Sequence, residues 1–488
     1  MNYLQFSEKN FKKELRPVRI LQFGEGNFLR AFADSFVQTL NETRGFNGNI
    51  AVVKPTSRGN FNKFTDQNCM YTVMIRGVSG GQILEETQVV DSIEEVFSPY
   101  TDYERFLSYA HAEDLELIIS NTTEAGIVFD EKDTFDSHPA ATFPGKLTQF
   151  LYERFCHFGG SENSGLILLP VELIDNNGDM LKDCVLRFAR TWELPSAFLS
   201  WVENACTFCN TLVDRIVSGF PAADAEEFFE KLGYEDQLLT VAEPFGLWVI
   251  EADEKVRGKI LPGCEDLPIL FTDNHKPFKE RKVRILNGAH TSFAMLAFLC
   301  GKDYVRQAMD DPEIYQFIET VLYREVMPCL SLPEEELTSF AEAVLERFRN
   351  PFLQHALLSI SLNSVSKWRA RCMPSLLAYE KAFGKLPSCL TFSLAALLCF
   401  YCGSRRSSDG LEYTVKDDAE VLEFFQTHQT AAAETMVQNY LARTDFHGQD
   451  LNQVPGLTAA VTAHLQTIRK LGIRQALSEL LNREYCNE

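Results

Sequence analysis

The stretch from residue 279 to residue 290 carries three side chains whose types and spacing suit work on a carbonyl group. Lys282, Asn287 and His290 follow one another at intervals of five and three residues. On an α-helix, where successive residues turn by about 100°, the three side chains fall within one arc of about 140°. One face would then hold an amine that moves a proton and two hydrogen-bond donors that stabilise developing negative charge. The pattern predicts a catalytic Lys-Asn-His set.

The neighbours of this set favour a catalytic role over the commoner alternative, a solvated helix face. Three polar residues on a helix are, by themselves, more typical of an exposed surface. Apolar neighbours, however, would desolvate the amine of Lys282 and lower its pKa, which suits a lysine that exchanges protons near neutral pH. The apolar residues of this segment are Ile285, Leu286, Ala289, Phe293, Leu296 and Ala297.

Five dispersed segments carry a resemblance to a known family. The K-x4-N-x2-H pattern of residues 282–290 resembles the catalytic signature of the polyol-specific long-chain dehydrogenases, the mannitol dehydrogenase group. The other segments that match are FGEGNFLRAF at 23–32, SNTTEAG at 120–126, LVDRIV at 212–217 and RFRNPF at 347–352. Because the likeness runs essentially from end to end, it is far more specific than any single motif.

The resemblance implies an NAD-dependent oxidoreductase. Within the family the chain is most similar to members that act on hexuronates, which implies the reversible reduction of D-tagaturonate to D-altronate by NADH in galacturonate catabolism. Lys282 would be the general acid of the reduction, and Asn287 and His290 would hydrogen-bond the reacting oxygen. Two alternatives stay open: a related polyol or fructuronate/mannonate dehydrogenase, and a non-catalytic dinucleotide-binding regulator.

A cofactor domain is indicated upstream by an apolar run at 18–23, the turn Gly24-Glu-Gly26 and aromatic residues at helical spacing. This order opens a nucleotide-binding unit, in which bare backbone approaches a pyrophosphate, although the usual third glycine is replaced by Leu29. Further strands are predicted at 50–53, 115–120 and 166–170, with ligands at their carboxyl ends. The predicted cofactor-binding residues are Ile20, Leu21, Gln22, Phe23, Gly24, Glu25, Gly26, Asn27, Phe28, Leu29, Arg30, Ala31, Asn121, Thr122, Thr123 and Glu124.

The residues after the second strand leave the choice of cofactor open. A dinucleotide fold usually presents an acidic residue there to the ribose, yet this chain has Lys54 and Arg58. Their chemistry favours the 2′-phosphate of NADP, or a solvated surface, whereas the resemblance implies NAD. We follow the resemblance and predict NAD.

Two positions depart from the pattern of the polyol-specific members. Those members carry an Asp-Asn pair where this chain has Glu172 and Leu173, which argues against a mannitol-like pocket. Many also carry a glutamate three residues before the lysine, where this chain has Lys279. We hypothesise that a second cation there lowers the pKa of Lys282 and attracts an anionic substrate.

A helical domain is predicted after residue 275, because helical periodicity with proline breaks replaces the strand pattern. The predicted fold class is thus α/β: a Rossmann-type domain over 1–275, then a mostly α-helical substrate and catalytic domain over 276–488. A uronate carboxylate needs a cation, and arginine binds it with two hydrogen bonds. The predicted substrate-binding residues are Arg284, Asn363, Lys367 and Arg371.

The composition limits partners and location. A net charge of −22 argues against nucleic acid and anionic membranes, so we expect a small hexuronate or aldonate as the partner. The 13 cysteines and the absence of a secretory signal pattern predict reduced thiols in the cytoplasm. The longest apolar run, 390–401, is too short to span a bilayer and predicts a buried helix. No metal site is predicted, and nothing indicates an oligomeric state.

Overall fold

In a computed structural model of the protein, six short apolar segments pair into one parallel sheet. The strand order is β6–β3–β2–β7–β8–β9, which is the Rossmann order 3-2-1-4-5-6. The order reverses between β2 and β7, so ligands are expected at the carboxyl ends of these two strands. The strands are β2 (Val18–Phe23), β3 (Asn49–Val53), β6 (Ile93–Phe97), β7 (Leu117–Ser120), β8 (Ile167–Pro170) and β9 (Thr207–Phe208).

The structure describes residues 3–9, 11–122, 125–403 and 413–486. The chain divides into two compact units, Met1–His275 and Lys276–Glu488. The expected fold class is confirmed, because the first unit contains the Rossmann sheet and the second is built from helices. Among the described residues, no helix has both the length and the apolar character needed to cross a membrane.

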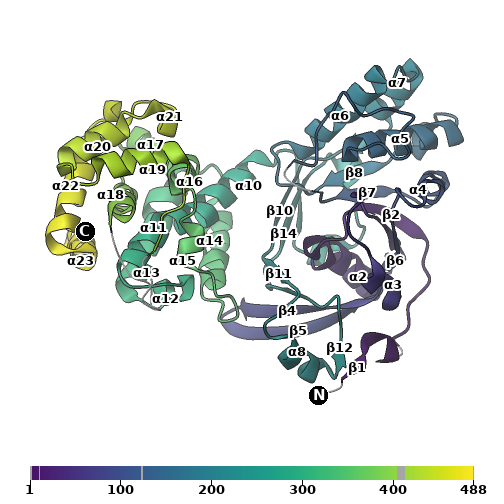
Figure 1. Cartoon of the computed structure of the whole chain (residues 1–488), viewed down its shortest axis with the longest axis horizontal. Coiled ribbons are helices and arrows are strands. Elements are labelled where there is room, and N and C mark those ends of the chain that lie inside the picture. Colours follow the sequence, from purple (N-terminus) through teal and green to yellow (C-terminus); the bar gives the residue numbers. More distant parts are fainter. Residues whose placement is uncertain (1–2, 10, 123–124, 404–412, 487–488) are drawn as a thin grey trace. The chain divides into compact units, whose positions relative to one another are not determined.

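Helices cover both faces of the parallel sheet (Figure 1). Successive strand residues point to opposite faces, so that Ile20 packs in the core under α2 while Leu21 packs in the core under α5 and α6. The helices of this unit are α1 (Asn27–Arg30), α2 (Ala33–Arg44), α3 (Asn62–Asp66), α4 (Tyr103–Ser108), α5 (Phe143–His157), α6 (Asn177–Thr191), α7 (Ser196–Asn204), α8 (Ala225–Leu232) and α9 (Glu254–Arg257), with 3-10 turns η1 (Phe6–Lys9), η2 (Tyr109–His111), η3 (Glu162–Ser164) and η4 (Cys264–Asp266).

The helix after the glycine turn is interrupted, which its aromatic spacing did not predict. Phe32 leaves helical geometry at φ −128° and ψ −92°, so α1 ends and α2 begins around it. The ring of Phe32 still packs between Phe28 and Phe36, with ring centroids 4.8 Å apart in both pairs. The periodic aromatic residues therefore mark a continuous packing stripe rather than a continuous helix.

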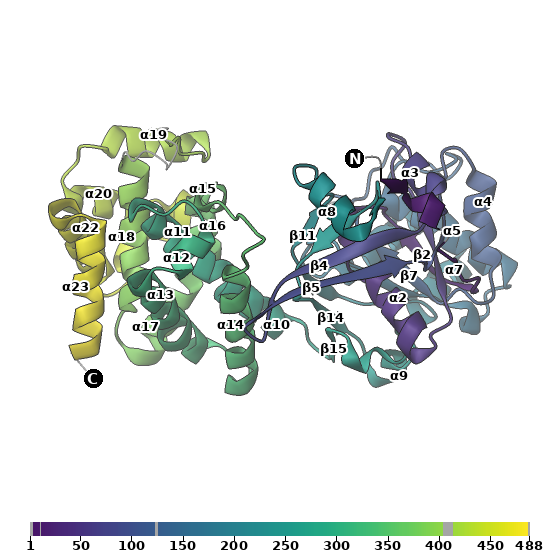
Figure 2. The same ribbon diagram turned by 90° about the horizontal axis from the view of Figure 1, so that it is seen from below.

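A second layer of strands includes the β4–β5 hairpin, which was not predicted, and strands near residues 238–250 and 267–271, where the apolar pattern of the sequence predicts them. The β4–β5 hairpin turns at Gly80-Gly81, whose positive φ angles of 59° and 74° suit a tight two-residue turn (Figure 2). The sheet β11–β13–β4–β5 contains β4 (Tyr71–Ser79), β5 (Gln82–Val90), β11 (Val217–Gly219) and β13 (Thr240–Ala242). Smaller sheets contain β10 (Thr211–Asp214), β14 (Leu247–Glu251) and β15 (Ile269–Thr272), and β1 (Leu4–Gln5) with β12 (Tyr234–Glu235).

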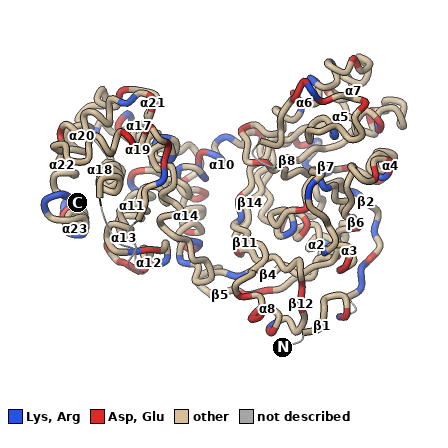
Figure 3. Tube along the Cα trace, viewed as in Figure 1, with Lys and Arg blue, Asp and Glu red and all other residues tan. Residues whose placement is uncertain are grey.

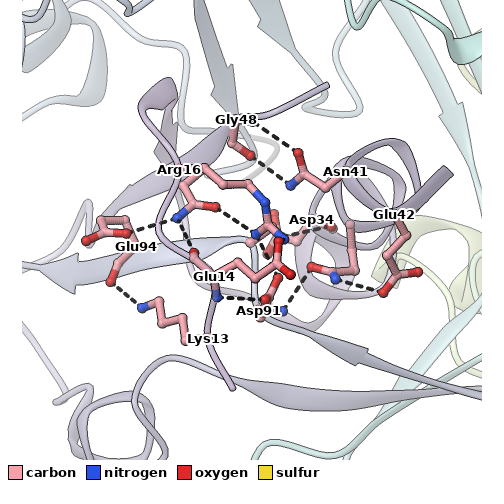
Figure 4. A network of polar contacts seen from close by, with 12 residues as sticks. Lys13, Glu14, Arg16, Asp34, Asn41, Glu42, Gly48, Asp91 and Glu94 are labelled. Carbon is pink, nitrogen blue, oxygen red and sulfur yellow. Dashed lines mark hydrogen bonds and ion pairs between the residues drawn. The ribbon is translucent and has the colours of Figure 1, made fainter. Parts of the chain in front are cut away.

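A polar network ties the segment before β2 to the amino ends of the neighbouring strands (Figure 4). Arg16 lies 2.9 Å from a carboxylate oxygen of Asp91, and both side chains are less than a tenth exposed. The backbone N–H of Glu14 donates to the other oxygen of Asp91, and Lys13 donates to the backbone carbonyl of Glu94. The network lies at the amino ends of these strands, whereas the glycine turn lies at the carboxyl end of β2.

In the described residues of the second unit, the regular secondary structure is helical, apart from one bridge between Tyr304 and Ala356. Its elements are α10 (Lys276–Arg281), η5 (Lys282–Asn287), α11 (Gly288–Leu299), α12 (Val305–Met309), α13 (Pro312–Glu319), η6 (Thr320–Val326), η7 (Met327–Cys329), α14 (Glu334–Phe348), α15 (Leu357–Ile360), α16 (Ser364–Arg371), α17 (Met373–Phe383), α18 (Ser388–Cys402), α19 (Ala419–His428), α20 (Ala433–Leu441), α21 (Thr444–His447), η8 (Leu451–Gln453), α22 (Leu457–Leu471) and α23 (Ile473–Cys486).

Helices α11 and α18 form the centre of this unit. Both are apolar on all sides, as helices buried in a core are, and α18 packs against α11 and α22. The buried helix predicted at 390–401 is therefore confirmed as part of α18. The next stretch, 403–411, is rich in Arg, Ser and Gly and predicts an exposed loop; after Gly403 it lies outside the described residues.

Candidate active site

The glycine turn lies at the reversal of strand order in the parallel sheet. Gly24 has a φ of 123°, and its backbone N–H donates to Val53 at 3.0 Å. A Cβ at this position would lie 2.7 Å from the backbone carbonyl oxygen of Asn121, so only glycine fits between β2 and β7. The turn thus brings bare backbone to the position where dinucleotides bind in this fold.

Only part of the predicted cofactor-binding stretch is open to a ligand. Glu25 and Phe28 are half-buried, and Gly26 and Asn27 are exposed. The remaining side chains are buried and help to shape the turn. These are Ile20, Leu21, Gln22, Phe23, Leu29, Arg30 and Ala31.

Arg30 shows how the tertiary structure uses a residue that the motif alone assigns to the cofactor. Its guanidinium donates to the backbone carbonyl of Leu238 and to the side chain of Asn27. Burial lowers the pKa of Arg30, while Tyr71 and nearby carboxylates oppose that shift. The side chain joins the turn to the segment before β13.

Glu172 accepts hydrogen bonds from residues at the carboxyl end of β7. Its buried carboxylate accepts hydrogen bonds from the hydroxyl of Ser120 and from the backbone N–H and hydroxyl of Thr122, all at 3.0 Å. Burial raises the pKa of Glu172, while these hydrogen bonds oppose the shift. Asn121 donates to the carbonyl of Val171 at 3.1 Å. Asn121 and Thr122 are therefore fixed beside the turn, whereas Thr123 and Glu124 lie outside the described residues.

Lys54 is buried at the carboxyl end of β3, with 5% of its surface exposed. Its amine lies 3.1 Å from a carboxylate oxygen of Glu25 and 3.0 Å from the hydroxyl of Thr56. The lysine is thus neutralised by an acid from the glycine turn. Arg58, in contrast, is exposed.

The predicted catalytic set lies on a π-helix rather than on the α-helix that its spacing suggested. Lys282–Asn287 form the π-helix η5, and α11 continues from Gly288. In a π-helix the hydrogen bonds join residues five apart, so Lys282 and Asn287 lie about one turn apart on one side. The helix type brings these two side chains closer together than the expected arc, and π-helical turns are frequent at functional sites.

His290 is the buried member of the set, with 8% of its surface exposed. Its ring stacks on Phe348 with centroids 4.1 Å apart, and its Nε2 has no hydrogen-bond partner among the described residues. Burial, aided by the positive charges of Arg347 and Arg371, holds its pKa well below the usual range. The ring is therefore neutral near pH 7, and an unpaired buried nitrogen of this kind is costly unless a ligand completes it.

Two arginines and a second histidine, from three segments, lie near His290. Arg347 comes from α14, Arg371 from the end of α16, and His355 from the segment between α14 and α15. The His355 ring lies edge-on to His290 at 5.0 Å, and the guanidinium of Arg371 contacts the hydroxyl of Thr291 at 3.4 Å. Sequence reasoning matched the segment of Arg347 to the family but gave neither Arg347 nor His355 a role.

The predicted carboxylate-binding residues divide into two groups. Lys367 and Arg371 share α16, are half-buried, and have pKa values lowered by burial. Arg284, however, is engaged by Glu280 at 2.8 Å and Ser375 at 3.1 Å. Asn363 lies just before α16 with a φ of 52° and is exposed. Lys367 and Arg371 thus belong to the cationic surroundings of His290, because the charge of Lys367 also lowers the pKa of His355.

The described residues contain no group of three or more His, Cys, Asp or Glu side chains arranged to hold a metal ion. The sequence contains two C-x-x-C pairs, at 206–209 and 399–402. Cys206 and Cys209 are buried, and burial raises the pKa of each thiol to about 12. Such thiols stay protonated and are poor metal ligands.

Two family models together match most of the chain. Residues 18–261 match the Mannitol dehydrogenase Rossmann domain, and residues 274–469 match the Mannitol dehydrogenase C-terminal domain. Altronate oxidoreductases of Escherichia coli O7:K1 and of Shigella flexneri are each 44% identical over 481 residues, which cover 97% of this chain and 99% of the relative.

Solved structures share the fold at lower identity. A Pseudomonas fluorescens mannitol 2-dehydrogenase, in a ternary complex with NAD and D-mannitol, is 22% identical with a TM-score of 0.68, over 96% of this chain and 95% of that one. A D-sorbitol dehydrogenase in substrate-free form is 21% identical with a TM-score of 0.80, over 95% of both chains.

Proposed function

Because the chain belongs to the mannitol dehydrogenase family, we propose that it is an NAD-dependent oxidoreductase that interconverts D-tagaturonate and D-altronate. The first unit would hold the dinucleotide, and the second would hold the sugar acid and carry the acid–base chemistry. The names of the relatives supply the substrate. The geometry of the site supports the reaction class and an anionic substrate.

One observation carries the proposal: a neutral, buried imidazole with an unpaired nitrogen lies among cations. His290 can donate a hydrogen bond to a substrate oxygen without carrying a charge. Arg347, Arg371 and Lys367 then supply positive charge in a chain whose net charge is −22. A site of this kind suits a molecule that has both a reacting carbonyl oxygen and a carboxylate.

The three residues of the set divide the work on the reacting oxygen. NADH, when bound, supplies the hydride. Lys282 donates a proton to the oxygen during reduction and removes it during oxidation of the alcohol. Asn287 and His290 donate hydrogen bonds to that oxygen, and such donors lower a barrier by about 3 kcal/mol each. Their positions on η5 and the first turn of α11 keep the donors on one rigid element.

Arg371 and Lys367 are the best placed of the predicted residues to bind the carboxylate. Arginine can bind a carboxylate through two parallel hydrogen bonds, whereas lysine acts as a point charge. Arg284 is a weaker candidate because its guanidinium already pairs with Glu280. Asn363 would act only through its exposed side chain at the start of α16.

Oxidation of NADH by the purified chain tests the proposal. D-tagaturonate, fructuronate and fructose are offered in parallel to the wild type and to Lys282→Ala. Turnover of tagaturonate that is lost in the variant would support both the reaction and the acid. Turnover of fructose instead would move the protein to the polyol dehydrogenases, and an unchanged rate in Lys282→Ala would remove the proposed role of Lys282.

Lys279 provides a separate test of substrate charge. It lies in α10, half-buried, one turn before Lys282. If its charge attracts the anionic substrate, Lys279→Glu raises the KM for the hexuronate and shifts the pH profile. An unchanged rate and pH profile in this variant would contradict the role.

We also propose that the enzyme works in the cytoplasm on a small sugar acid, with neither nucleic acid nor membrane as a partner. The support is the strongly acidic balance of the chain and its many cysteines, several of which are buried thiols.

A further inference from the structure

The carboxyl end of β3 lacks the acidic residue that a dinucleotide fold normally presents to the ribose. Lys54 occupies the position directly after the strand. Its ammonium group is held inside the protein by Glu25 at 3.1 Å and Thr56 at 3.0 Å. A cation at this place would favour a 2′-phosphate, so its pairing needs an explanation.

Glu25 brings a carboxylate to the same place from a different part of the chain. It lies in the glycine turn, which is tied to β3 by the hydrogen bond from Gly24 to Val53. Its side chain is 26% exposed, whereas that of Lys54 is 6% exposed. The carboxylate therefore neutralises the lysine on its inner side and keeps a solvent-accessible side for a ligand.

We propose that Glu25 binds the adenosine ribose hydroxyls and that the Glu25–Lys54 pair selects NADH against NADPH. The proposal rests on the dinucleotide site of the proposed function. Glu25 replaces the missing strand-end acid as the hydrogen-bond acceptor for the ribose. The same carboxylate repels a 2′-phosphate, which carries close to two negative charges, and prevents Lys54 from binding it.

The test measures cofactor binding directly. NADH and NADPH are titrated separately into the purified full chain, without any sugar acid, and the fluorescence of the bound nicotinamide is followed. The variants are Glu25→Gln, Lys54→Met and the double variant Glu25→Gln/Lys54→Met. Lys54→Gln, which keeps a polar end for Thr56, serves as a second variant without the cation.

Glu116→Gln is the matched control. Glu116 also pairs with a basic residue, Arg19, at 2.8 Å, but it lies just before β7, at the amino ends of the strands of the same sheet. Removing its charge changes the net charge of the unit as much as Glu25→Gln does. We expect this control to bind both cofactors as the wild type does.

In Glu25→Gln we expect NADH to bind about tenfold or more weakly, as loss of a hydrogen bond to a charged group predicts. NADPH should bind more tightly, because Lys54 then offers an unpaired ammonium group to the 2′-phosphate. The gain for NADPH should disappear in Glu25→Gln/Lys54→Met and in a second double variant, Glu25→Gln/Lys54→Gln. The ratio of the dissociation constants for NADH and NADPH in each variant therefore tests the proposal.

Equal weakening of both cofactors in Glu25→Gln would overturn the proposal, since a purely structural role of the turn has that effect. An NADPH gain that persists without Lys54 would overturn it as well. A failure of the proposed function gives a different result. No hexuronate would then support the oxidation of NADH, while the dissociation constants of NADH and NADPH would still be measurable.

Discussion

At the scale of single residues, buried ionisable groups determine how the first unit holds its ligand site. Glu172 fixes Thr122 by two hydrogen bonds at 3.0 Å, and Asp34 accepts one from Tyr71 at 3.1 Å. Each carboxylate is buried, so its charge costs free energy unless its partners compensate for the lost water. The two residues therefore allow two separate predictions, one for cofactor binding and one for stability.

We predict that Glu172→Ala weakens NADH binding about tenfold, because Thr122 loses a charged hydrogen-bond partner and its segment is released. Glu172→Gln should restore most of the affinity, since its amide oxygen can still accept from Thr122. Fluorescence titration of both variants checks this. NADH binding that is unchanged in Glu172→Ala, or equally weak in both variants, would contradict the positioning role.

We predict that Asp34→Asn stabilises the first unit above pH 6. Burial raises the pKa of Asp34 to about 6 from 3.8. As the pH rises between these values, the unfolded chain ionises while the folded chain keeps its proton, so the wild type loses about 3 kcal/mol. The variant does not titrate and avoids this loss. Below about pH 4 the two should unfold alike, apart from a constant difference in packing.

Calorimetry at about pH 8 and about pH 4 measures the effect on the unfolding of the first unit. That unfolding transition is recognised as the one whose temperature NADH raises. Asp66→Asn, on the exposed face of α3, is the control and should change little at either pH. A stabilisation of the same size at both pH values would show that the gain comes from packing rather than from ionisation.

At the scale of elements, the π-helical turn η5 is the feature on which the proposed chemistry depends. It packs against α14, α16 and the second π-helix, η6. A π-helix is less favourable than an α-helix for an isolated chain, so the surrounding helices must hold it in place. As a consequence, residues five apart lie on one side of the helix.

We predict that deleting Val283 lowers kcat about hundredfold or more while the unit stays folded. The deletion leaves four steps between Lys282 and Asn287 and lets the turn become α-helical, which misplaces the proton donor relative to the two hydrogen-bond donors. Steady-state kinetics and far-ultraviolet circular dichroism measure both effects. Val283→Ala, which keeps the chain length, should stay close to the wild type. Full activity in the deletion variant would show that the π-helical turn is not needed.

At the scale of the whole molecule, the acidic residues and the proposed substrate-binding cations are distributed differently. Acidic residues are spread over both units in Figure 3, in keeping with the net charge of −22. The cations proposed to bind substrate are concentrated around His290 instead. The second unit also contains the buried His447 and the half-buried His464, and burial lowers the pKa of each to about 4.

We predict that the second unit loses stability as the pH falls from about 6.5 to about 4. In this window the unfolded chain binds protons on its histidines while the folded chain does not, so the unfolded state is favoured. His447→Gln, whose amide can still donate to Tyr440, should reduce the loss by about 3 kcal/mol at most.

Thermal unfolding across this pH range checks the prediction. The relevant transition is that of the second unit, whose temperature NADH does not change. His428→Gln, in the same unit and half-buried, is the control. If the wild type and His447→Gln lose stability with the same slope, the acid sensitivity of this unit has another cause.

The sequence by itself determined those features that depend on local spacing. Runs of four to six mostly apolar residues predicted β2, β3, β7 and β8 closely, because such runs are buried on both faces of a parallel sheet. Helical periodicity predicted a second unit without strands. The Gly24-Glu-Gly26 turn and the K-x4-N-x2-H pattern likewise depend only on the order of neighbouring residues.

The tertiary structure alone decided which side chains meet across long stretches of chain. Glu25 and Lys54 are 29 residues apart, and Glu172 and Thr122 are 50 apart, so no local pattern predicts either contact. The Arg30 guanidinium stands in the cofactor motif but donates to the carbonyl of Leu238. The helix that carries the aromatic stripe of Phe28, Phe32 and Phe36 is interrupted at Phe32, although the stripe itself continues. The π-helical form of η5 also depends on the helices packed around it, because local spacing by itself favours the α-helix.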